Sequence, residues 1–236
     1  MSSQNEVAKS KGLIVAIDGP AGSGKSTVTH LLARALGYIH IDTGALYRAI
    51  ALGALDSGTS LDDGAALGRI ADSAHLEFRW IGERNHLFMN GEDVSPRIRT
   101  PEISAAASTV SAHSEVRQAL LGLQRKFGEA GGVVLEGRDI GTVVFPNAHV
   151  KFFLSASVDI RAQRRMAELE SKDIYLSFEE VRKQVISRDK ADSERKIAPL
   201  KKADDAIEVD STSLTVDQVV SLMKENVLKR KSALGL

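Results

Sequence analysis

The stretch IDGPAGSGKST, Ile17 to Thr27, stands between an apolar run and a segment with helical periodicity. Residues 13–17 form a continuous apolar run, which is typical of a buried strand in a parallel sheet. The glycines that follow permit a tight turn. From Lys25 onward apolar residues recur at helical spacing, and Gly37 is expected to end that helix as its C-cap. The stretch therefore predicts a strand, a glycine-rich loop and a helix in direct succession.

This loop matches the pattern G-x-x-x-x-G-K-[ST], which is typical of a phosphate-binding loop in that structural context. Successive backbone N–H groups converge on phosphate oxygens where no Cβ blocks them, and the helix N-terminus adds a favourable dipole. Lys25 would bring a positive charge to the outer phosphates, and the Ser26 hydroxyl would bind Mg²⁺. The predicted nucleotide-phosphate site comprises Gly19, Pro20, Ala21, Gly22, Ser23, Gly24, Lys25, Ser26 and Thr27.

Composition narrows the class of protein further. The chain has 236 residues, 43% of them hydrophobic, which fits a globular protein with one core. Basic and acidic residues both number 31, and this balance argues against a partner held through nucleic-acid phosphates. The absence of cysteine excludes disulfides, thiolate catalysis and cysteine-based zinc sites. Residues 1–11 are polar and resemble no secretory signal, so we expect a cytoplasmic monomer without membrane contact.

Strand-like and helical patterns alternate along most of the chain. Short apolar runs at residues 38–41, 133–135, 150–154 and 206–209 read as further strands, and all but the run at 133–135 are followed by a helical pattern. This alternation predicts a doubly wound parallel α/β sheet in a single domain over residues 12–236, preceded by a disordered tail at 1–11.

One segment breaks the alternation. Residues 74–94 switch to a two-residue period and contain Asn90-Gly91, the strongest short hairpin signal. We therefore expect a small antiparallel meander within an insert spanning residues 60–110. Residues 103–127 are expected to be helical, in one piece or two.

Polar side chains follow the predicted strands. In a parallel sheet the loops after the strands open on one rim, so residues 18–19, 42–44, 136–139 and 155–157 are expected to meet there. Asp18 has two readings, as a cap for the loop or as a group that steadies water or magnesium. The six histidines are scattered and are read as structural or surface residues.

Arginines recur at helical spacing in the second half of the chain. Arg161, Arg164 and Arg165 share one helix face, and so do Arg188, Asp192 and Arg195. Surface ion pairing explains any single arginine, but guanidinium groups also match phosphate oxygens. A phosphate loop binds the donor, so a second arginine set is needed where the acceptor itself carries a phosphate.

Several longer motifs resemble the bacterial cytidylate kinases. They are DTGALYR (residues 42–48), EDVSPRIRTPEIS (92–104), EGRDIGTVVFP (136–146), RAQRRM (161–166) and SRDKADSERKIAPL (187–200). The resemblance covers nearly the whole chain. It implies a P-loop kinase fold with an enlarged CMP-binding lobe, a short helical lid over residues 159–176, and transfer of the ATP γ-phosphoryl group to CMP or dCMP with Mg²⁺.

The same resemblance assigns roles to individual residues. It implies catalytic roles for Lys25, Arg138, Arg164 and Arg188, and ATP contacts for Arg161 and Arg165 in addition to the phosphate loop. It implies a CMP site made of Thr43, Arg48, Ser108, Arg117, Arg138, Asp139, Arg188, Asp192 and Arg195. Asp139 suits cytosine because a carboxylate accepts from the exocyclic amino group and would repel the carbonyl of uracil.

Three alternatives stay open at this point. A P-loop kinase for another small acceptor, such as UMP, AMP or shikimate, shares the phosphate loop. A GTPase-type switch usually carries an N-K-x-D motif, and the chain has none. A nucleic-acid-binding protein is disfavoured by the neutral charge balance.

Overall fold

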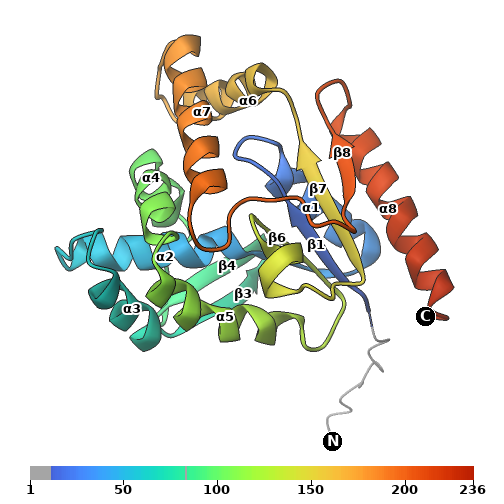
Figure 1. Cartoon of the computed structure of the whole chain (residues 1–236), viewed down its shortest axis with the longest axis horizontal. Helices are drawn as coiled ribbons and strands as arrows, with labels where there is room; N and C mark the ends of the chain where they lie inside the picture. The colour runs from blue at the N-terminus through green and yellow to red at the C-terminus, as the bar shows by residue number, and fades with distance from the viewer. Residues whose placement is uncertain (1–11, 83) are drawn as a thin grey trace, which may run out of the picture.

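Strands and helices alternate in the computed structural model, which describes residues 12–82 and 84–236 (Figure 1). The elements are β1 (Ile14–Asp18), α1 (Lys25–Leu36), β2 (Ile39–Asp42), α2 (Thr43–Asp56), α3 (Gly64–Ser73), β3 (Leu76–Ile81), β4 (Arg84–Met89), β5 (Glu92–Asp93), η1 (Arg97–Arg99), α4 (Pro101–Val110), α5 (Ser114–Gly128), β6 (Val133–Gly137), η2 (Ile140–Val144), β7 (Val150–Ser155), α6 (Val158–Glu170), α7 (Phe178–Glu194), β8 (Ile207–Asp210) and α8 (Val216–Ala233). The tail predicted at 1–11 lies outside the described residues.

A five-stranded sheet carries the fold. Its order is β2-β6-β1-β7-β8, and every neighbouring pair is parallel. The predicted doubly wound α/β sheet is thereby confirmed. Because all five strands run the same way, the loops after β1, β2, β6 and β7 open on one rim, as expected. The register brings Glu136 opposite Ile17 of β1 and opposite Asp42 of β2.

Helices cover both faces of this sheet. On one face α1 and α8 pack on a cluster whose largest member is Phe152, together with Leu32, Leu154 and Met223. On the other face the short η2 segment and the partly buried Phe127 of α5 cover Leu135 and its neighbours. The sheet is therefore buried on both sides, which explains why its strands read as continuous apolar runs.

Local signals place the helix ends close to the expected residues. Gly37 adopts φ 68° at the C-cap of α1, and the Asp42 side chain accepts a hydrogen bond from the backbone N–H of Ala45. Thr215 and Gln218 form a reciprocal capping box at α8. Helix α6 begins at Val158, one residue before the lid segment expected at 159–176, and the Ser157 side chain caps it.

The segment that broke the alternation forms a small lobe beside the sheet (Figure 1, lower left). Strands β3, β4 and β5 are antiparallel, and Asn90 and Gly91 join β4 to β5 with φ of 53° and 87°. The meander is thereby confirmed. The helical stretch expected from 103 to 127 divides into α4 and α5, which pack with α2 and α3 around a core separate from the sheet clusters. Glu83, which stands between β3 and β4 in the sequence, lies outside the described residues.

Helices α6 and α7 form a hairpin at the rim (Figure 1, top). They share a small apolar cluster of their own, built on Ala162, Leu169, Val181 and Val185. A pair of helices with so small a core gains little stability from burial, which suits an element that moves. Within residues 12–82 and 84–236, no helix combines the length and the apolar character needed to cross a membrane.

Candidate active site

The glycine-rich loop between β1 and α1 has a backbone that other residues do not readily adopt. Gly19, Gly22 and Gly24 have φ of 154°, 75° and 88°. A Cβ on Gly19 would lie 2.0 Å from the carbonyl oxygen of Leu154, and one on Gly22 would lie 3.0 Å from that of Arg161. These contacts, together with the φ values, explain the glycines of the motif. The loop thus aims its N–H groups and the α1 N-terminus at the rim, which is the geometry of an anion site.

Lys25 begins α1 and lies folded back over this loop. Its Nζ donates to the carbonyl oxygen of Pro20 at 2.6 Å and to the Ser23 hydroxyl at 3.3 Å. Burial lowers its pKa well below the usual value, and the positive charge of Arg138 adds to that effect, while Glu136 opposes it. A lysine in such surroundings gains most from an anion that neutralises the local charge.

Glu136, at the end of β6, is a site residue that the sequence reasoning missed. It is buried, its Oε2 accepts from the Ser26 hydroxyl at 2.9 Å, and its Oε1 lies 2.8 Å from His40 Nε2. The signal was available in part, because an acidic residue at the end of a strand adjacent to β1 must lie beside the phosphate loop. His40 was read only as a structural or surface residue.

Three arginines from different elements influence one another near the phosphate loop, since the charges of Arg138 and Arg188 act on Lys25 and that of Arg48 acts on Arg188. Arg138 donates through Nε to Asp192 Oδ2 at 2.8 Å, and Arg48 donates to Asp42 at 2.5 Å. Burial and then the charge of Arg138 lower the pKa of Arg188 to about 10, and Arg48 contributes to the same shift. Like charges that crowd one place in this way repel each other, so an anion between them is stabilising.

Two of these arginines carry a buried donor without a partner. Within the part of the chain that the structure describes, the Nε–H groups of Arg48 and Arg188 are buried and donate a hydrogen bond to no acceptor. Buried donors are nearly always paired in folded proteins, and an unpaired one costs about 1–3 kcal/mol. Oxygen atoms of a bound anion would satisfy both.

A second charged group lies deeper, between the small lobe and α7. Asp139 Oδ2 forms a short ion pair with Arg117, and its Oδ1 lies 3.6 Å from Arg195 Nη2. Burial raises the pKa of Asp139, although both arginines oppose the shift. Arg117 also lies over the ring of Tyr47, with its Cζ 5.4 Å from the ring centroid. The more distant Oδ1 keeps acceptor capacity for a ligand.

Two further residues of the predicted acceptor site lie at the edges of this group. Thr43 is buried, and its hydroxyl donates to the Glu136 carbonyl oxygen at 2.7 Å, which ties α2 to β6. Ser108 is partly buried on α4, and its carbonyl oxygen accepts from the Ser111 hydroxyl at 2.9 Å. Thr43 thus supports the backbone of the rim, while Ser108 belongs to the small lobe.

The arginines of α6 serve different partners although they share a helix face. Arg161 is buried, forms a bidentate ion pair with Asp189 of α7 at 2.9 and 2.6 Å, and donates to the carbonyl oxygen of Ala21. Arg164 donates to the backbone of Ser23 and Ser211. Arg165 pairs with Glu168 on its own helix. The first two therefore hold the phosphate loop by its main chain, and the roles toward ATP that the resemblance implies stay predictions.

The Asp18 side chain has its hydrogen-bond partners in the segment that follows β6. Its carboxylate accepts from the backbone N–H groups of Ile140 and Gly141 at 2.8 and 2.7 Å. Burial raises its pKa to about 6, against the effect of these two donors. Asp18 therefore fixes the turn that directly follows Arg138 and Asp139, and through it the position of both side chains.

Known proteins resemble this chain over most of its length. The sequence model of the family described as cytidylate kinase matches residues 15–229. A cytidylate kinase of Citrifermentans bemidjiense is 54% identical over 222 residues, which are 94% of this chain and 95% of that protein. The cytidylate kinase of Geobacter sulfurreducens is 52% identical over 225 residues, 94% of this chain and 96% of that protein. A solved gluconokinase from Sinorhizobium meliloti 1021 covers 95% of both chains with 15% identity and a TM-score of 0.49, a likeness too low to bear on function.

Proposed function

This chain belongs to the cytidylate kinase family, a family of ATP-dependent phosphotransferases, and we propose that it transfers the γ-phosphoryl group of ATP to CMP or dCMP at the rim of its parallel sheet. One observation carries the assignment of the site: among the described residues the buried Nε atoms of Arg48 and Arg188 have no hydrogen-bond partner, and the charge of Arg188 acts on Lys25 of the phosphate loop. A phosphate loop alone serves a donor nucleotide. An acceptor that carries its own phosphate requires additional arginines with free donors to bind that phosphate.

The donor would lie in the loop of Gly19–Thr27. Its backbone N–H groups and the α1 N-terminus would bind the phosphates, and Lys25 Nζ would leave the Pro20 carbonyl oxygen for the outer phosphate oxygens. Arg161 and Arg164 support this arrangement, because they hold the loop main chain at Ala21 and Ser23. Their proposed contact with ATP, and that of Arg165, would need the α6–α7 hairpin to move as a lid.

The residues at the rim fit a magnesium ion brought by ATP. The Ser26 hydroxyl and the Glu136 carboxylate lie 2.9 Å apart, and Mg²⁺ prefers such oxygen donors together with phosphate oxygens and water. In kinase sites Mg²⁺ usually has one or two protein ligands and completes its shell with substrate phosphate oxygens and water. When bound, the ion supplies positive charge that neutralises the β- and γ-phosphates.

The acceptor would lie across the rim from the donor. Arg48, Arg138 and Arg188 would bind the α-phosphate of CMP, while Asp192, which already accepts from Arg138, would approach the ribose with Arg195. Asp139 Oδ1 would accept from the cytosine amino group, and Arg117 and Ser108 would contact the other polar atoms of the ring. Thr43 would keep β6 and α2 at the spacing that this arrangement needs.

The chemistry then requires no covalent intermediate on the protein. An oxygen of the CMP phosphate attacks the γ-phosphorus, the bond from that phosphorus to the β–γ bridging oxygen breaks, and ADP departs with that oxygen. The protein aligns two anions that repel each other and screens their charge with Lys25 and the arginines. Closure of the lid would exclude the water that otherwise hydrolyses ATP.

We further propose the division of labour suggested by the sequence. Residues 60–110 would form the acceptor-binding insert, which the separate apolar core of the small lobe supports, and residues 159–176 would form most of the lid. The proposal includes a cytoplasmic enzyme that acts as a monomer, without membrane or nucleic-acid partners. The neutral charge balance and the lack of cysteine support it.

ADP release measured with a panel of acceptors tests the function. With ATP and Mg²⁺ we expect turnover with CMP and dCMP, and kcat/KM at least about 10-fold lower with UMP, because the carbonyl of uracil faces the Asp139 carboxylate. AMP and shikimate should give no more than background hydrolysis. Preferred turnover of any of these three would contradict the assignment.

Arg188→Ala tests the acceptor half of the site. Loss of a charged hydrogen bond to phosphate costs about 1.5–3 kcal/mol, so KM for CMP should rise about 10- to 100-fold with a much smaller change in KM for ATP. Lys190→Ala provides the control, because that exposed side chain on the same helix pairs only loosely with Glu194. Steady-state kinetics with varied CMP measure the effect. An unchanged CMP response in Arg188→Ala would refute the role given to this arginine.

A further inference from the structure

His40 contacts Glu136 of the candidate site, although from the sequence it is interpreted as a structural or surface residue. It lies on β2, the edge strand of the sheet, and its Nε2 is 2.8 Å from Glu136 Oε1. A carboxylate only accepts hydrogen bonds, so the histidine nitrogen is the donor in this contact. The other carboxylate oxygen of Glu136 accepts from Ser26. Both oxygens of one buried group are therefore engaged, one by β2 and one by α1.

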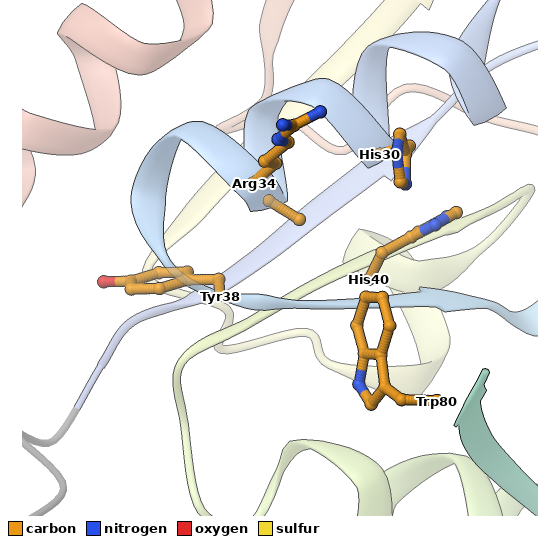
Figure 2. A pocket seen from close by; sticks show the side chains of 6 residues that line it. His30, Arg34, Tyr38, His40 and Trp80 are labelled. Atoms are coloured by element: carbon orange, nitrogen blue, oxygen red, sulfur yellow. The ribbon is translucent and has the colours of Figure 1, made fainter. Parts of the chain in front are cut away.

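The ring of His40 is held in place from several sides. Figure 2 shows it between His30 of α1 and Trp80 of β3, in a pocket of about 200 Å³ that these residues line with Arg34 and Tyr38. The His30 and His40 rings meet edge to face with centroids 6.1 Å apart. The His40 carbonyl oxygen accepts from Asn85 Nδ2 of β4 at 2.9 Å. His40 is thus fixed between the sheet and the small lobe.

A glutamate needs such a support more than a shorter acid does. Its carboxyl group lies three rotatable bonds from the backbone, and holding that group in one orientation costs side-chain entropy. A fixed donor that selects one orientation reduces this cost at the moment a ligand binds. The pKa of His40 is raised, because the hydrogen bond and the charge of Glu136 outweigh the lowering effect of burial. Nε2 donates in the imidazolium and in the Nε2–H tautomer alike, so the contact persists in both forms.

We propose that His40 is a positioning residue, which holds the Glu136 carboxylate against the Ser26 hydroxyl and so preorganises the magnesium side of the phosphate loop. This proposal rests on the proposed function insofar as Ser26 and Glu136 are taken to bind the metal of the ATP complex. His40 itself contacts neither substrate nor metal. It acts through one hydrogen bond, and loss of an outer partner of this kind typically lowers metal affinity or activity about 10- to 100-fold.

Three substitutions at this position separate the hydrogen bond from packing. His40→Gln keeps an N–H donor at a reach close to that of Nε2, whereas His40→Phe keeps the ring and His40→Leu keeps an apolar side chain without a donor. Trp80→Leu removes the aromatic wall of the pocket and leaves the bond to Glu136 intact. The two donor-free variants are both made, so that poor folding of one does not decide the result.

Calorimetric titration with ADP, in Mg²⁺ and again in EDTA, measures the metal-linked part of binding without turnover. We expect the gain in ADP affinity due to Mg²⁺ to fall about 10-fold in His40→Phe and His40→Leu, and to stay within about threefold of wild type in His40→Gln and Trp80→Leu. ADP affinity in EDTA and KM for CMP should not change. The proposal is overturned if a folded donor-free variant shows the same Mg²⁺-dependent gain in ADP affinity as wild type. It is also overturned if His40→Gln loses as much of that gain as His40→Phe. Failure of the proposed function differs from both, because wild type would then release no ADP with CMP.

Discussion

Lys25→Ala is expected to lower kcat about 10²- to 10³-fold with CMP and with dCMP alike, the loss typical of removing one preorganised positive donor from a developing charge. Lys25 is buried, its Nζ donates to the phosphate loop at Pro20, and the charges of Arg138 and Glu136 act on it. The lysine charge stabilises most in the transition state, when the γ-phosphoryl group lies between the attacking oxygen of CMP and the leaving oxygen of ADP. The turnover number should therefore fall far more than the affinity for CMP. Steady-state kinetics with both substrates varied provide the measurement.

The stability of this variant distinguishes catalysis from folding. Burial and the charge of Arg138 already disfavour the Lys25 ammonium, so its removal should leave the thermal midpoint unchanged or slightly raised. Lys25→Met keeps the aliphatic stem and should show the same loss of kcat. A kcat within tenfold of wild type in either variant would contradict the role proposed for this lysine.

The order of the elements was predictable because its signals are local. Glycines between a strand and a helix and an Asn90-Gly91 turn act within a few residues of backbone, and the structure confirms both of them. The parallel direction of the strands follows from the same alternation. The fold class could therefore be predicted without knowing which side chains contact each other.

The partners of the charged residues were not predictable in this way. Helical spacing placed Arg161 and Arg164 on one face, but nothing local shows that Asp189 and the loop main chain bind them. Glu136 stood inside a recognised motif, yet its contact with Ser26 joins residues 110 positions apart. Such contacts arise from strand order and register, so they appear only once the sheet is assembled.

Gly19→Ala should disable the enzyme through its backbone, without removing any functional side chain. Gly19 has φ 154°, a conformation that residues with a side chain rarely adopt. The new Cβ would also lie 2.0 Å from the Leu154 carbonyl oxygen, and that oxygen belongs to β7, which is held between β1 and β8. Because neither strand can yield, the loop itself must move.

Gly19→Ala is expected to lower both the stability of the protein and its activity with ATP. Strained φ and overpacking each contribute about 1–3 kcal/mol, which corresponds to a lowering of the thermal midpoint by roughly 5–20 °C in a chain of this size. Displacement of the loop by about 1 Å should reduce kcat/KM for ATP about 10²-fold. Thermal unfolding and kinetics at a temperature where the variant is folded measure the two effects separately.

Gly122→Ala is the matched control for this substitution. Gly122 lies within α5, and an added Cβ there meets no atom within 4 Å, so alanine should raise stability by about 0.5–1 kcal/mol without affecting turnover. The same replacement of glycine by alanine is thus expected to lower stability at Gly19 and to raise it at Gly122. If Gly19→Ala instead retained wild-type activity and stability, the loop would have to tolerate a side chain at this position. The close contact between β1 and β7 that brings the phosphate loop to the rim would then not be required for function.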